Sequence, residues 1–264
     1  MRILIRTSKW AIWARRFGSL ALPLAIVPVF MHRERLITSA EFHLVEAIAM
    51  GVAVAALLLA VGAFARLWVT GDEGWGKATM GLFFSLLCLL PLAFVVVLAL
   101  RYPPVSDVTT DFERPPGLVS PVATAPWTAA ERAAIEAAFP NARTRRYPIE
   151  APQIYAFAAQ LAEQKGGEIR ARRAPQSALA EGQINAIATT LLGWRDEVVI
   201  RVTGDPQGSS VAMRATALHG LHDLGENGRH IEEFLAALDA QITLFMRDAP
   251  VAPTPAPAPA EQDG

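Results

Sequence analysis

The histidines and carboxylates near the C-terminal end are of the types that hold transition metals. They fall within twelve positions of the chain: His219, His222, Asp223, Glu226 and His230. Imidazole and carboxylate are the usual ligands of zinc and iron, so a metal-dependent hydrolase is one function to consider. The spacing argues against it, because Gly220 and Gly225 interrupt the helix that would place ligands on one face. We therefore expect a surface turn with exposed histidines, no metal and no cofactor.

Other catalytic signatures are missing from the sequence. It has no Gly-x-Ser-x-Gly elbow and no glycine-rich phosphate loop, and its one cysteine, Cys88, lies in an apolar segment. The formal net charge of −1 gives no basic surface for nucleic acid. An enzyme is therefore a weaker expectation than a binding protein, and nucleic acid is not an expected partner.

Four arginines form a candidate anion site. Arg143 and Arg145 alternate on one predicted strand, and Arg170 and Arg172 on another, so each pair shares a strand face. If the two strands are neighbours, they form a basic patch that could bind anionic lipid head groups or envelope polymers. The alternative is a solvated sheet face that is balanced by glutamates nearby in the chain.

The first hundred residues read as a membrane region. The mean hydropathy of +0.29 is high for one soluble domain, and the excess lies before Arg101. We expect transmembrane spans at about 12–31, 46–65 and 78–100 within a region 1–101. The first is short and contains Pro23 and Pro28, so the sequence leaves open whether it spans, is a cleaved signal peptide, or re-enters.

The positive-inside rule sets the expected orientation. Five basic residues precede the first span, whereas Arg33 and Arg35 after it are accompanied by glutamates. Three spans then place the rest of the chain outside, as a periplasmic domain on a multi-pass protein of the bacterial inner membrane. A re-entrant first segment would place it in the cytoplasm instead. Partners expected there are membrane lipid and an envelope protein or polymer.

The remainder predicts an α+β fold, with an antiparallel sheet covered by helices. A Pro-rich linker or wrap at 102–127 precedes a globular domain at 128–247, and a disordered Pro/Ala tail at 248–264 follows. Helices are expected at 128–139, 151–165 and 227–246, and strands at 143–149, 168–173, 183–192, 197–203 and 209–217. The Asp205–Gly208 turn should join the last two strands as a hairpin.

Two motifs resemble a known family. The run Thr110-Asp111-Phe112-Glu113-Arg114-Pro115-Pro116 resembles the TD-x-x-x-PP opening of the bacterial family DUF1499, and Asp223-Leu224-Gly225-Glu226-Asn227 resembles its DLG-x-N signature. The resemblance covers about 102–246 and implies a membrane-anchored domain without established catalytic residues. Of the family's R-S-x-S-R run only Arg214 is present, so a site built on those serines would be absent. Apart from the resemblance, Asp223 and Asn227 could each cap the final helix.

These observations leave three functions open. The leading one is a non-enzymatic, membrane-anchored envelope domain that binds a lipid, a polymer or a protein. The alternatives are a metal-dependent hydrolase that uses the His219–Asp223 cluster, and a membrane assembly subunit whose main contacts lie between helices.

Overall fold

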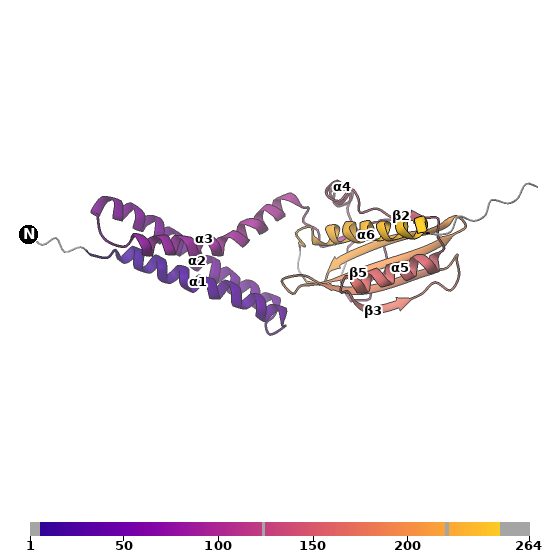
Figure 1. The fold of residues 1–264 in the computed structure, drawn as a ribbon, viewed down its shortest axis with the longest axis horizontal. Helices are drawn as coiled ribbons and strands as arrows, with labels where there is room; N and C mark the ends of the chain where they lie inside the picture. The colour runs from indigo at the N-terminus through magenta and orange to yellow at the C-terminus, as the bar shows by residue number, and fades with distance from the viewer. Residues whose placement is uncertain (1–5, 123–124, 220–221, 249–264) are drawn as a thin grey trace, which may run out of the picture.

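The chain forms a helical bundle and an α+β domain, joined end to end (Figure 1). The structure is a computed structural model that describes residues 6–122, 125–219 and 222–248. The predicted Pro/Ala tail lies outside these ranges except for Asp248, which is the last residue of a helix.

Three helices make up the bundle: α1 (Lys9–Arg33), α2 (Ser39–Thr70) and α3 (Trp75–Arg101). Each is long and apolar enough to cross a membrane, as predicted. They approach closely because their buried residues are small, as at Ala14, where a Cβ added to Gly81 would lie 2.8 Å from the Ala14 Cβ. Large apolar side chains consequently point outward, where a bilayer would surround them.

The two ends of the bundle are distinct. Far from the domain, the segment before α1 hydrogen-bonds the turn between α2 and α3, with Ser8 N 2.9 Å from Glu73 O. The turn between α1 and α2, residues 34–38, lies at the other end, beside the domain (Figure 1). The α1–α2 turn and the domain are therefore on the same side of any membrane that the bundle crosses.

The domain is built on one antiparallel sheet of six strands. Its main path runs β1 (Asp107–Thr109), β6 (Gly208–Ala217), β5 (Arg195–Asp205), β4 (Glu181–Thr189) and β3 (Glu168–Arg173), and β2 (Arg145–Tyr147) also pairs with β6. The predicted hairpin is confirmed, with Asp205 opposite Gly208.

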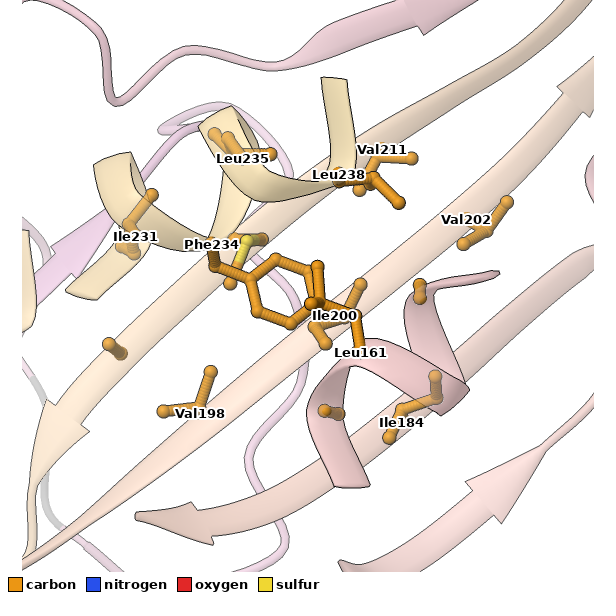
Figure 2. Close-up of a cluster of buried hydrophobic side chains, with 14 of the residues drawn as sticks. Leu161, Ile184, Val198, Ile200, Val202, Val211, Ile231, Phe234, Leu235 and Leu238 are labelled. Atoms are coloured by element: carbon orange, nitrogen blue, oxygen red, sulfur yellow. The ribbon is translucent and has the colours of Figure 1, made fainter. Parts of the chain in front are cut away.

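Helices cover one face of this sheet and enclose the core. They are α4 (Ala129–Ala138), α5 (Ala151–Gln164) and α6 (Glu226–Asp248). Alternation on β5 turns Val198, Ile200 and Val202 toward them, where they meet Leu161 of α5 and Phe234 of α6 (Figure 2). The capping box expected at Thr128 and Glu131 is present and fixes where α4 begins.

The other face of the sheet is covered by residues 110–122, which we call the strap. Glu197 and Arg201 of β5 alternate with the core residues and point into the strap, yet both are buried. The sequence predicted one buried face for these strands, whereas both faces of β5 are buried. The predicted α+β class is confirmed, but β1, inside the region expected to be linker, was missed because three residues are too few to show periodicity.

Candidate functional site

The domain docks on the α1–α2 turn through the turn between β4 and β5. His32 donates from Nδ1 to the carbonyl oxygen of Leu192 at 2.8 Å, and Arg33 donates from Nη1 to the carbonyl of Leu191 at 2.9 Å. A neutral His32 ring can then accept at Nε2 from the hydroxyl of Ser39, 3.1 Å away. Side chains of the membrane region thus satisfy backbone groups of the domain.

Trp194 provides the apolar part of this contact. Its ring packs edge-on against Phe42 at 5.7 Å between centroids and stacks on His43 at 5.8 Å, and His32 lies 5.6 Å away. Aromatic pairs at such distances contribute about 0.5–1.5 kcal/mol each beyond the area that they bury. The junction is therefore held by packing as well as by hydrogen bonds.

A cavity of about 420 Å³ lies beside Trp194, between the domain and the membrane turn. We call it the junction cavity. Its lining comes from the end of α1, the start of α2, the β4–β5 turn and the segment after β6: His32, Arg35, Ile37, Thr38, Ser39, Ala40, Gly193, Trp194, Arg195 and His219. The residues that connect two spans lie at the membrane surface, so the cavity lies at the depth of the lipid head groups.

The lining of the junction cavity is basic. It includes the guanidinium groups of Arg35 and Arg195 and two imidazoles, and none of its residues is acidic. Glu168 lies 3.6 Å from Arg195, but the Arg195 Nε atom is buried and has no hydrogen-bond partner among the described residues. Ser39 and Ala40 begin α2, where the first N–H groups of a helix favour an anion. An anionic group of small size fits this chemistry.

The structure separates the histidines that the sequence grouped. His219 is exposed at the junction cavity, the Nδ1 atom of His222 accepts from the N–H of Leu224, and His230 lies on α6 beside a small cavity of about 20 Å³. Burial, together with the nearby Lys165, lowers the pKa of His230. No group of three metal-binding side chains occurs within the described residues.

The family motif residues hold the fold together. Asp223 accepts from the N–H of Asn227 at 2.9 Å and from that of Gly225 at 2.9 Å, and so caps α6, as expected. Asn227 was an alternative cap, but its side chain instead donates to Ser106 O at 3.0 Å. Gly225 has φ +80° and lies against the ring of Tyr102, which leaves no room for a side chain.

The opening motif fastens the strap. The hydroxyl of Thr110 accepts from Met213 N at 2.8 Å, and Asp111 pairs with Arg201 at 2.7 Å. Arg214 forms a two-bonded ion pair with Asp107, at 2.9 and 2.6 Å, and donates to Pro116 O, next to Pro115, at 3.4 Å. These contacts place the motif at the covered face of the sheet, away from the junction cavity.

The arginine patch does not form. Arg145 lies on β2, which pairs with β6, whereas Arg170 and Arg172 lie on β3 at the opposite edge of the sheet. Each of these three also has an acidic partner, namely Asp239, Glu168 and Glu163. Arg143 precedes β2 and is exposed. The condition that the two strands be neighbours is therefore not met, because β5 and β4 lie between β6 and β3.

The junction cavity was missed by the sequence reading. Trp194 and His32 are separated by 162 positions, and each alone is typical of a turn or of a helix end. The available signal was weak: an aromatic residue after Gly193, and basic residues in the turn between two spans. Only the docking of the domain brings these groups together.

A membrane-anchored α+β domain with a strap-covered sheet is the class that this architecture defines. The model of the family described as "Protein of unknown function (DUF1499)" matches residues 107–238, half of the chain, and the chain belongs to that family. The match spans the strap, the sheet and most of α6, and it leaves the three apolar helices outside. Searches of curated proteins and of solved structures found no match.

Proposed function

We propose that this chain is a non-enzymatic, membrane-anchored envelope protein whose junction cavity binds the anionic head group of a membrane lipid. The observation that carries the proposal is the basic cavity at the membrane surface, between Arg35 of the α1–α2 turn and Arg195 of β5. A guanidinium group binds phosphate through paired N–H donors, which suits a phospholipid head group.

Two further features support a lipid as the ligand. Leu191 at the tip of the β4–β5 turn is 81% exposed, and Leu36 in the α1–α2 turn is 71% exposed. Since Arg33 hydrogen-bonds Leu191, both leucines lie at the membrane surface, where apolar tips are stabilised by acyl chains. The cavity is therefore open to a region that is rich in lipid.

The orientation proposed is that of a bacterial inner-membrane protein with a periplasmic domain. The bundle end far from the domain carries Arg6, Lys9, Arg66 and Lys77, and basic residues favour the cytoplasmic side. A periplasm-active reporter fused after Arg101 or after Asp248 should be active, and a cytoplasm-active reporter should be silent. The reverse pattern would place the junction cavity on the cytoplasmic leaflet.

The binding test compares lipids of different charge on the full chain. Purified protein in detergent is mixed with phosphatidylglycerol or phosphatidylcholine, and bound lipid is counted by native mass spectrometry. We expect preferential binding of phosphatidylglycerol, which the Arg195→Gln and Arg35→Asn variants lower about tenfold each. Asparagine at position 35 tolerates the left-handed conformation found there, with φ 60°.

The control is Arg143→Gln, which removes one positive charge from an exposed residue that does not line the junction cavity. It should bind like the unaltered chain. Equal binding of the two lipids, or equal losses in all three variants, would show that charge at the junction cavity does not select the ligand.

A further inference from the structure

The packing of α3 stops halfway along the helix. Its buried residues are Ala78, Gly81, Ser85 and Cys88, a stripe at helical spacing that faces the other two helices. Pro91 follows, and residues 90–97 are all exposed. Figure 1 shows the distal half of α3 bending away from α1 and α2 toward the domain. The three helices thus diverge below the junction cavity.

The α1–α2 pair remains closed over the same depth. The rings of His32 and Phe42, at the domain end of these helices, lie 4.9 Å apart. The opening therefore lies between α3 on one side and the α1–α2 pair on the other. We call it the wedge. Its walls are apolar, and its wide end faces the domain.

One polar group lies at the level where the wedge begins. Glu46 of α2 is in step with Phe42, Ala49 and Ala53, which are buried, so it belongs to the packed face of α2. Its Oε1 atom is buried and has no hydrogen-bond partner among the residues that the structure describes. A buried polar atom without a partner is costly, and a hydroxyl or amide of a bound amphiphile would satisfy it.

We infer that the wedge holds the acyl part of the lipid whose head group occupies the junction cavity. This inference rests on the proposed function and goes further, because it requires a chain-bearing lipid rather than a soluble phosphate. A basic cavity at the membrane surface above an apolar opening matches one kind of molecule, an anionic amphiphile. The ligand enters sideways from the bilayer, between the distal half of α3 and α2.

The helix periodicity identifies which side chains face the wedge. The packed stripe of α3 continues through Leu92 and Val95, which are 42% and 37% exposed, whereas Leu90, Phe94 and Val97 on the other side are 67%, 62% and 59% exposed. The inward and outward positions differ little in chemistry, so a matched pair of variants is available.

The test fills the wedge in the full-length chain and uses phosphatidylglycerol as the probe. Val95→Trp should lower retention of the lipid in native mass spectra about tenfold, while Val97→Trp, which faces away, should leave it unchanged. Leu92→Trp is a second wedge-filling variant in case Val95→Trp does not fold, as judged by circular dichroism. Glycerol 3-phosphate should compete poorly, because it lacks the acyl chains.

The outcomes separate this inference from the proposed function. If Val95→Trp and Leu92→Trp retain lipid while Arg195→Gln loses it, or if glycerol 3-phosphate competes fully, the head-group site stands and the wedge is not part of it. If the tryptophan variants lose lipid while the arginine variants keep it, the chains are bound but the proposed head-group site is wrong.

Discussion

Asp196 and Glu197 are adjacent on β5, are both buried, and point to opposite faces of the sheet with opposite pKa shifts. Burial, reinforced by the charges of Asp223 and Glu226, raises the pKa of Asp196 to about 7. Burial alone would also raise the pKa of Glu197. Hydrogen bonds from the Val119 and Ser120 backbone and from Asn185 outweigh it and hold that pKa below the ordinary value.

The Asp196→Asn variant should be more stable than the unaltered chain at pH 8, by on the order of 3 kcal/mol. The folded chain binds the Asp196 proton more tightly than the unfolded chain does, since the folded pKa lies above the ordinary 3.8. The stabilisation by this proton is complete below pH 4 and is lost as the pH rises through 7. Thermal unfolding of the solubilised chain at pH 4 and pH 8 checks this, and an equal gain at both would contradict it.

Glu197→Gln should show the opposite pH dependence. The carboxylate accepts from two consecutive N–H groups of the strap, and a glutamine would turn an NH₂ group toward one of these donors. We expect a loss of about 1–3 kcal/mol at pH 7. Because the folded pKa is lowered, this stability is present above the ordinary value of 4.5 and disappears as the pH falls through the folded pKa. Chemical denaturation at pH 7 and pH 3 measures it, and a loss that persisted at pH 3 would point to packing instead.

Breaking the ion pair that fastens the strap should destabilise the domain strongly. Asp111→Ala leaves the Arg201 guanidinium, whose side chain is 6% exposed, without its nearest carboxylate, at a cost of about 3 kcal/mol or more. The control is Glu113→Ala, which breaks an exposed ion pair with Arg132 on the same strap and should cost less than about 1 kcal/mol. Similar losses in both would mean that the buried pair contributes no more than a surface one. The double variant with Arg201→Met should recover part of the stability lost in Asp111→Ala.

Gly225→Ala should be more damaging than Gly166→Ala, although both positions are left-handed. The added methyl at Gly166, with φ +76°, meets no atom within 4 Å, so it costs only about 1 kcal/mol of backbone strain. At Gly225, with φ +80°, the methyl would lie 2.4 Å from the Tyr102 ring, between α6 and the chain that leaves α3. We expect an additional loss of about 1–3 kcal/mol in denaturant unfolding. Equal losses would show that the Tyr102 ring moves aside freely.

Local patterns determined most of the elements. Runs of apolar residues defined three spans because crossing a bilayer requires a fixed length, and alternation defined the four long or central strands because one face of each meets the helices. The Thr128 capping box and the Asp223 cap were also legible, since these bonds join residues two to four positions apart. Even the family's motifs were readable before the fold was known, although not the reason for them.

Only the tertiary structure decided which residues meet across long separations. Sequence alternation gave the faces of β2 and β3 but not their order in the sheet, so the arginines assigned to one patch lie at opposite edges. The same limit hid the strap contacts of Glu197 and Arg201, and the docking of Trp194 on His32, which lies 162 positions earlier in the chain. Periodicity reports a neighbourhood of a few residues, whereas a cavity between a membrane turn and a sheet depends on how whole elements pack.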